Sequence, residues 1–393
     1  MSDGRHDAGA VFTLTPGPAG ATPATLAALG RPILHPQDPA FRELYAQTVG
    51  LLRQAFGTPH DPVILQGEAS VGLEAAFASL IAPGDVVLNL VSGVFGKGSG
   101  RLARRYASEV IEIEVGYDSA VPAERVRDAL RARPDIGIVS VVHCETPSGT
   151  MNDLGAIAGA MAGHDALLVV DAVSSFGGAR CDLAGWHVDL GVVAPQKCLG
   201  GAPGLSLLHV SEAAWRHMEA NPRAPRRSVL SVLDWRDVHL SGHSFPFTPS
   251  ISQVYALHSC LEQYLAEGPA AVQARHHGAA CAVRAGAVAL GLELWPTDEA
   301  ICSDTVTALA MPAGVDEGQV RAVARAESGV MLAGGRAELA GRVLQIGHMG
   351  PAASPLSPVI GLVALGSALR RLGGKADIGG AVEAALAAAG PDR

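Results

Sequence analysis

The stretch "DLGVVAPQKCLGG" (residues 189–201) joins a short apolar run to a lysine and a pair of glycines. The apolar part has no polar alternation, which is typical of a strand buried on both faces of a sheet. The lysine is notable because the chain has 29 Lys plus Arg, yet only Lys97, Lys197 and Lys375 are lysines. An amine can lose its proton and add to a carbonyl, whereas a guanidinium stays charged. The stretch therefore predicts a buried strand that leads to a chemically active Lys197.

Runs of the same kind recur through the first two thirds of the chain. A helical pattern covers 39–56. After it, apolar runs at 61–66, 85–91, 110–115, 136–142, 166–171 and 204–210 alternate with helical patterns at 71–82, 97–107, 122–132 and 154–163. Doubly buried strands that alternate with helices indicate a mainly parallel sheet covered by helices. We expect a three-layer α/β domain over residues 21–270, preceded by an N-terminal segment, residues 1–20.

The pattern changes after residue 249. Two longer helical patterns cover 249–268 and 269–291, and the part at 271–292 is expected to bridge two domains. A new alternation then begins, with strands near 305–311, 329–332 and 343–347 and helices at 316–327, 356–372 and 377–389. This order predicts a smaller α+β C-terminal domain over residues 293–393.

Composition limits the function classes. Hydrophobic residues make up 48% of the 393 residues, enough for a large core. The net charge of −9 without a basic block argues against nucleic acid as a partner. The start is polar and no apolar run approaches the ~18 residues of a membrane span. Six cysteines without a CxxC pair read as reduced thiols. We expect a soluble cytoplasmic protein with no membrane and no metal.

Three polar side chains follow expected strands. Asp171 ends "ALLVVD", Lys197 follows "DLGVVA", and Thr146 follows the strand at 136–142. Ligands of open α/β sheets bind outside the carboxyl ends of the strands. A ring cofactor with a pyridine nitrogen requires a carboxylate partner, and its aldehyde requires a lysine amine. The three residues fit such a cofactor; the alternative is that Asp171 caps a turn and Lys197 lies on the surface.

Several longer motifs carry a family resemblance. They are "VVDAVSSFGG" (169–178) and "DLGVVAPQKCLGGAPGLSLLHVSE" (189–212), with "LTPGP" (14–18), "HCETPSG" (143–149) and "IGHMG" (346–350). In this order they resemble the class V, fold-type I aminotransferases, which depend on pyridoxal 5′-phosphate. The runs at 65–76, 91–98, 194–205 and 245–252 resemble most the pyridoxamine–pyruvate branch of that family. The resemblance implies a homodimer or homotetramer.

The resemblance also implies roles for particular residues. Lys197 would form an imine with the cofactor and move the proton between carbon atoms. Asp171 would pair with the pyridine nitrogen and keep it protonated. Phe95 and Val173 would cover the two faces of the ring, and Thr146 would bond near its phenolic oxygen.

Glu68 raises the question of whether the cofactor carries a phosphate. It opens the expected helix of "LQGEASVGLEAA", followed by Ala69 and Ser70. A helix N-terminus binds anions, and most relatives have small or hydroxyl residues there. A carboxylate would repel a phosphate and could bond a neutral hydroxymethyl group, which favours unphosphorylated pyridoxamine or pyridoxal as a substrate. The alternative is that Glu68 caps the helix, and that Ser70, Gln196 and a partner subunit's Thr248 hold the phosphate.

The carboxylate end of the site departs from the family pattern. The family has Arg-Ile-Gly-His-Met-Gly, but this chain has Gln345 in place of the arginine. An arginine grips a carboxylate with two charged contacts, and glutamine offers neutral ones. Arg336 is left to hold the substrate carboxylate, because Arg342 is expected to point the other way. His35 stands where the pyridoxamine–pyruvate members have an aromatic hydroxyl.

The sequence thus predicts an aminotransferase that moves an amino group between pyridoxamine and a small 2-oxo acid, with pyruvate giving L-alanine. One alternative is a conventional phosphate-bound transaminase acting on alanine or serine with glyoxylate. Others are a non-catalytic vitamin sensor, or a desulfurase with Cys144 or Cys198 as nucleophile. The run "GVFGKGSG" (93–100) hints at a phosphate loop but lacks its spacing.

Overall fold

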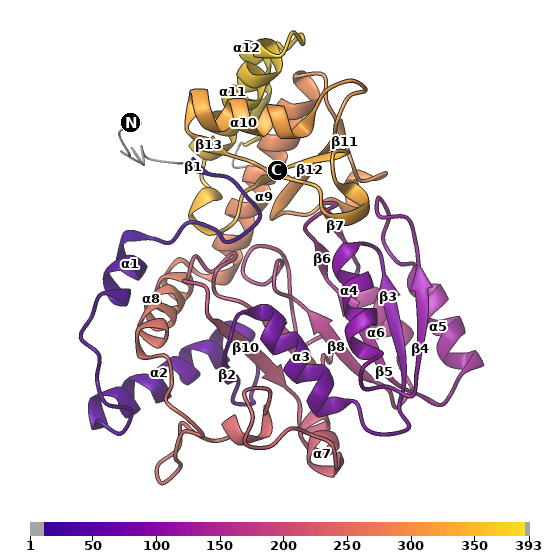
Figure 1. The fold of residues 1–393 in the computed structure, drawn as a ribbon, viewed down its shortest axis with the longest axis vertical. Helices are drawn as coiled ribbons and strands as arrows, with labels where there is room; N and C mark the ends of the chain where they lie inside the picture. Colours follow the sequence, from indigo (N-terminus) through magenta and orange to yellow (C-terminus); the bar gives the residue numbers. More distant parts are fainter. Residues whose placement is uncertain (1–11, 390–393) are drawn as a thin grey trace, which may run out of the picture.

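The computed structural model describes residues 12–389 (Figure 1). A seven-stranded sheet has the order β2-β10-β9-β8-β5-β3-β4. Its strands are β2 (Val63–Gln66), β3 (Val86–Val91), β4 (Glu109–Glu114), β5 (Ile136–Val142), β8 (Leu167–Asp171), β9 (Leu190–Val193) and β10 (Leu205–Val210). Only β10 runs antiparallel to its neighbours in this sheet. The predicted α/β class with a mainly parallel sheet is confirmed.

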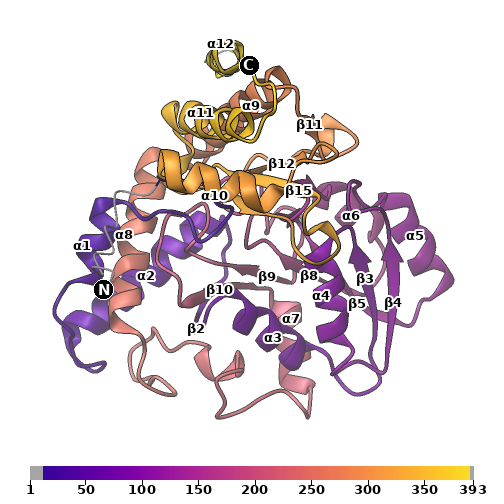
Figure 2. The same cartoon turned by 45° about the horizontal axis from the view of Figure 1, so that its top comes forward.

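Burial explains why these strands read as unbroken apolar runs. All residues of β3, β9 and β10 are buried, because helices cover both faces of the sheet (Figures 1 and 2). The helices of this part are α1 (Pro23–Leu29), α2 (Pro39–Phe56), α3 (Ala69–Leu80), α4 (Val94–Ala103), α5 (Ala123–Ala132), α6 (Leu154–Ala160), α7 (Glu212–Ala220) and α8 (Ile251–Glu267). The short α1 and α7 were not predicted from periodicity.

Capping residues set the helix bounds. The Asp38 side chain accepts a hydrogen bond from the Ala40 N–H at 2.8 Å, Pro39 begins α2, and Gly57 ends it at a φ of 63°. The bounds of α2 match the sequence pattern. By contrast, α4 begins at Val94, three residues before the expected start, because glycines in its first turns hide the helical pattern.

A smaller unit lies above the sheet in Figures 1 and 2. Its antiparallel sheet has the order β11-β12-β15-β14, formed by β11 (Glu293–Leu294), β12 (Val306–Ala310), β14 (Ala333–Gly334) and β15 (Val343–Gly347). Helices α10 (Glu317–Ser328), α11 (Leu356–Arg371) and α12 (Ile378–Ala388) pack with it. The long α9 (Pro269–Ala289) places Val272 in the first hydrophobic core and Ala282 in the second. These two cores support, as a proposal, the division near 270 and 293.

The described N-terminal residues join the smaller unit. Strand β1 (Phe12–Thr13) pairs in parallel with β13 (Val330–Met331), and Leu14 is buried in the second core. The chain then passes over Lys197, so that "LTPGP" lies against the end of the large sheet. Within residues 12–389, no helix combines the length and the apolar character that a bilayer span requires.

Candidate active site

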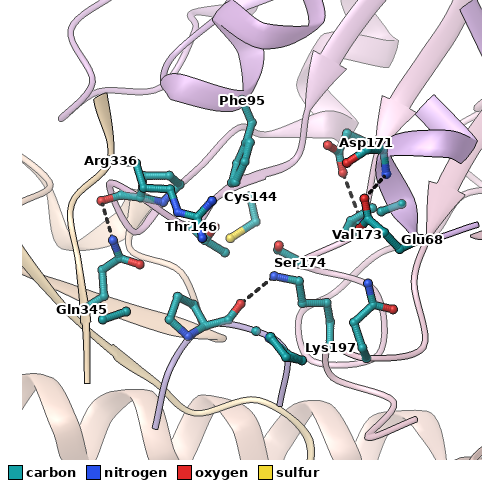
Figure 3. Close-up of a pocket in the computed structure, with 18 of the residues that line it drawn as sticks. Glu68, Phe95, Cys144, Thr146, Asp171, Val173, Ser174, Lys197, Arg336 and Gln345 are labelled. Carbon is teal, nitrogen blue, oxygen red and sulfur yellow. Dashed lines mark hydrogen bonds between the residues drawn. The ribbon is translucent and has the colours of Figure 1, made fainter. Parts of the chain in front are cut away.

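A cavity of ≈ 670 Å³ lies between the strand ends of the large sheet and the smaller unit. Figure 3 shows side chains from both units around it. Most predicted site residues line it: Glu68, Ala69, Ser70, Phe95, Thr146, Asp171, Val173, Gln196, Lys197, Arg336 and Gln345. Residues almost 280 positions apart in the chain therefore meet at one site.

Lys197 lies just beyond β9 and is largely buried. Its Nζ donates a hydrogen bond to the Pro16 carbonyl at 2.6 Å, and the side chain reaches into the cavity (Figure 3). Burial lowers the pKa of the amine, opposed in part by Asp171. Gly17 is required for this approach, since a Cβ there would lie 2.6 Å from the Lys197 Cε. The amine is thus held in place and more readily deprotonated than that of a surface lysine.

Asp171 is the last residue of β8. Its Oδ1 accepts a hydrogen bond from the Val173 N–H at 3.0 Å. Burial raises the pKa of its carboxyl to about 6, while this hydrogen bond and the nearby Lys197 work in the opposite direction. The carboxylate is therefore charged at neutral pH, and among residues 12–389 it forms no salt bridge. A protonated ring nitrogen would supply one.

The cavity walls suit a flat ring. Phe95 and Val173 both line the space next to Asp171, and Thr146 adds a buried hydroxyl (Figure 3). Gln196 is buried, and its Oε1 has no hydrogen-bond partner among the described residues. A buried acceptor of this kind is costly unless a ligand or water satisfies it. The residues present therefore fit a pyridoxal-type ring.

The start of α3 is less suited to a phosphate. Glu68 is the N-cap of this helix, and its Oε1 accepts a hydrogen bond from the Ser70 N–H at 2.9 Å. The carboxylate of the chain itself thus occupies the position where a helix N-terminus would hold an anion. A second anion there would be repelled, whereas a neutral hydroxyl group could donate to the carboxylate.

The opposite end of the cavity is formed by the smaller unit. Gln345 lies in β15, and its Nε2 donates to the Gly334 carbonyl at 2.7 Å and to the Pro147 carbonyl at 3.5 Å. Two carbonyl acceptors fix the orientation of the amide, so its oxygen is the atom on the cavity side (Figure 3). Arg336 also lines this end, and Arg321 does so while bonded to Glu317 at 2.7 Å.

Three residues discussed from the sequence lie away from the cavity. The Arg342 guanidinium stacks on the Trp295 ring at 4.9 Å, facing away as expected. His35 is exposed, and its Nδ1 accepts from the Gln37 N–H at 3.1 Å. Thr248 is exposed as well. The cavity of the single described chain therefore includes neither His35 nor Thr248.

Sequence reasoning missed part of the lining. Pro16 and Gly17 contact Lys197, and only the turn-rich "LTPGP" could have indicated this.

Cys144 also lines the cavity, but burial raises the pKa of its thiol to about 11. Burial likewise raises the pKa of Cys198. Both thiols stay protonated at neutral pH, which argues against a desulfurase nucleophile. Between residues 12 and 389, no cluster of His, Cys, Asp or Glu is arranged to hold a metal ion.

Comparison with known proteins gives the site a family context. The family model for class-V aminotransferases matches residues 37–347. A pyridoxamine–pyruvate transaminase of Mesorhizobium japonicum is 49% identical over 377 residues, which cover 96% of each chain. The crystal structure of pyridoxamine–pyruvate aminotransferase from Mesorhizobium loti superposes with a TM-score of 0.95 at 49% identity, covering 96% of each chain.

A second solved structure is also similar, at lower identity. The ureidoglycine–glyoxylate aminotransferase from Bacillus subtilis superposes with a TM-score of 0.91 at 29% identity. The alignment covers 96% of this chain and 97% of that one. The fold is thus shared with enzymes that are named for different substrates.

Proposed function

The chain belongs to the class-V aminotransferases, and from this membership we propose that it moves an amino group between unphosphorylated pyridoxamine and a small 2-oxo acid. With pyruvate as acceptor, the products are pyridoxal and L-alanine. The transaminase of Mesorhizobium japonicum that is 49% identical is named for this pair of substrates. The proposal uses the cavity at the end of the large sheet for both partners, which bind in turn.

The carboxylate of Glu68 at the start of α3 is the feature that favours the unphosphorylated vitamer. It accepts the Ser70 N–H at 2.9 Å and lines the cavity. A phosphate dianion placed there would face the negative charge of Glu68, which is exposed in the described chain, and the two like charges would repel each other. A hydroxymethyl group carries no charge and can donate one hydrogen bond. The residue therefore supports pyridoxamine over its phosphate ester.

The residues around the ring would divide the work. A bound pyridoxal or pyridoxamine ring supplies an electron-withdrawing system beside the carbon that exchanges its amino group. Asp171 pairs with the protonated ring nitrogen, and Phe95 and Val173 hold the flat ring between them. Lys197, with a pKa lowered by burial, takes and returns the proton at the reacting carbon. Arg336 orients the carboxylate of the oxo acid.

A conventional phosphate-bound transaminase is the second candidate. Ser70 and Gln196 line the Glu68 end of the cavity, where they would contact a phosphate. The ureidoglycine–glyoxylate aminotransferase from Bacillus subtilis shares the fold closely. This candidate requires the cofactor to stay bound through dialysis as a phosphate ester, which the first does not.

We also propose a homodimer or homotetramer. His35 and Thr248 are exposed on segments outside the cavity of their own chain. In an oligomer they would complete the cavity of a neighbouring subunit. Sedimentation analysis of the wild-type protein tests this, because a monomer that is fully active would exclude such a contribution.

The central experiment is a transamination assay with dialysed protein, pyridoxamine and pyruvate, in which pyridoxal and alanine are measured together. Equal amounts of both products are expected. Lys197→Ala should reduce turnover by about 10³-fold or more, because general acid–base catalysis contributes 10²–10⁴-fold and the covalent role is lost as well. Lys375→Ala, a change at an exposed lysine, is the matched control. Turnover retained in Lys197→Ala would refute the assignment.

A further inference from the structure

One buried carboxylate next to the cavity has no part in the chemistry described above. Glu145 ends the short strand β6 (Cys144–Glu145) and is 0% exposed. Its Oε2 accepts a hydrogen bond from the Phe95 N–H at 2.9 Å, and its Oε1 accepts one from the Gly96 N–H at 2.6 Å. Both carboxylate oxygens are thus bonded to the backbone at the start of α4.

The start of α4 has no cap of its own. Its N-cap is Gly93, which has no side chain to bond the free N–H groups of the first turn. In most helices a Ser, Thr, Asp or Asn at the N-cap does this. Here the carboxylate comes from Glu145, 50 residues later than Phe95, and its charge also suits the positive end of the helix.

The glycines of "GVFGKGSG" leave room for this carboxylate. A Cβ on Gly93 would lie 2.6 Å from the Glu145 Oε2. A Cβ on Gly96 would lie 3.1 Å from its Oε1 and 2.9 Å from the Leu90 carbonyl. The run that resembled a phosphate loop therefore does bind an acidic group, but that group is a side chain of the same protein.

Holding a carboxylate here carries a cost. Burial raises the pKa of Glu145 to about 7, the two backbone hydrogen bonds oppose this, and the negative Asp171 adds to it. Simple capping of an exposed helix end would not need a buried acid from a distant strand. The residue whose backbone it grips is Phe95, and the Phe95 ring lines the cavity (Figure 3).

We propose that Glu145 is the positioning residue for Phe95. By fixing the N–H groups of Phe95 and Gly96, it sets the start of α4 so that the aromatic ring covers one face of the bound pyridoxamine ring. The inference rests on the proposed function, because it assumes that a flat ring binds between Phe95 and Val173. Glu145 itself bonds to backbone and not to the reacting atoms.

The first test measures the helix start without any ligand. In Glu145→Gln, the amide offers one acceptor and one donor to two N–H groups, so one N–H loses its partner. Hydrogen exchange of a peptide covering 93–103 should become faster by about tenfold or more, since each lost partner weakens local protection. Asp189→Asn is the matched control, because Asp189 also accepts a backbone N–H, from Leu168 at 2.9 Å, away from the cavity.

The second test measures the ring. Glu145→Gln should raise the Kd for pyridoxal about 3- to 10-fold, the range expected for loss of a well-oriented aromatic contact. Phe95→Ala should have a similar effect, and the double variant should be no worse than Phe95→Ala alone. Gly93→Ala should act like Glu145→Gln, and it carries the test if Glu145→Gln does not fold.

The outcomes separate this role from the proposed function. Additive effects of Glu145→Gln and Phe95→Ala on ring binding would overturn the positioning role while leaving the function intact. The same holds if Glu145→Gln binds pyridoxal as tightly as Asp189→Asn. If the wild-type protein bound no B6 vitamer, phosphorylated or not, the proposed function would fail and the role of Glu145 with it.

Discussion

The two ends of the cavity carry opposite charges and are built from different parts of the fold. At the ring end, Glu68 follows strand β2 and Asp171 ends strand β8 of the large sheet. At the acceptor end, Arg336 comes from the smaller unit, as does Arg321, whose charge is paired with that of Glu317. A ligand with a protonated ring nitrogen and an acceptor with a carboxylate would therefore be drawn to different ends of the same space.

The two ends also differ in how strongly the sheet topology fixes the positions of their residues. Parallel strands place their carboxyl ends at one edge, so residues that follow β2, β8 and β9 must meet. Gln345 instead lies within β15, opposite Ala308 and Ala333, and Arg336 follows the two-residue strand β14. A single exchange in the smaller unit can thus change the acceptor without disturbing the ring site. The difference predicts that vitamer choice and acceptor choice are separable.

The largest change in vitamer preference is expected when Glu68 is replaced. Glu68→Ser removes the fixed charge but keeps a capping side chain, so affinity for pyridoxal 5′-phosphate relative to pyridoxal should rise about 10- to 100-fold. Titration of dialysed protein with each vitamer gives the two Kd values. Asp38→Ser is the control, since Asp38 caps α2 in the same manner outside the cavity. An unchanged ratio in Glu68→Ser would show that the carboxylate does not select the vitamer.

The two ends should also respond differently to pH. Burial raises the pKa of Asp171 to about 6, so below that pH the carboxyl becomes neutral and loses its attraction for the ring nitrogen. Affinity for pyridoxal should fall by about tenfold for each pH unit below 6. The acceptor is expected to bind to the guanidinium of Arg336 and not to a carboxyl group, so the KM for pyruvate should change little over the same pH range.

Two nearby groups also contribute to the pH dependence of pyridoxal binding. The variant Asp171→Asn separates their contributions from that of Asp171. Glu145 titrates near pH 7 and Lys197 has a lowered pKa. In Asp171→Asn the fall below pH 6 should disappear, while the contributions of the other groups and of the ligand remain. An equally steep fall in Asp171→Asn would assign the titration to another group.

Much of the ring end could be predicted from the sequence. The unbroken apolar runs predicted the buried strands, and Asp171 and Lys197 at their ends both line the cavity, because the geometry of a parallel sheet leaves little freedom. The family resemblance added Phe95 and Val173, which no strand-end argument could supply. Glu68 was informative because a helix start follows a strand there.

Other contacts depend on the packing of distant segments and left no local signal. The bond between Lys197 and the Pro16 carbonyl requires the N-terminal segment to pair with β13, which a two-residue strand does not reveal. The role of Glu145 could not be predicted because its partners are backbone N–H groups, which every residue type except proline carries. The early start of α4 was missed because glycines in its first turns hide the helical pattern and because its cap lies elsewhere in the chain.

The smallest effect is expected on the KM for pyruvate when Gln345, at the acceptor end of the cavity, is replaced. The Gln345 amide is committed to the Gly334 carbonyl at 2.7 Å, which leaves an oxygen, not a donor, toward the cavity. Gln345→Arg would place a second guanidinium beside Arg336, with Ala308 and Ala333 as small neighbours in the sheet. The KM for pyruvate should fall about 3- to 10-fold, at the low end for charge-assisted hydrogen bonds, while the Kd for pyridoxal stays the same.

Gln345→Leu is the control: because the native oxygen cannot donate to a carboxylate, its KM for pyruvate should stay within about twofold of wild type. A large rise in Gln345→Leu would mean that the amide turns and grips the acceptor, and then the two ends of the cavity would differ less than their resting hydrogen bonds indicate.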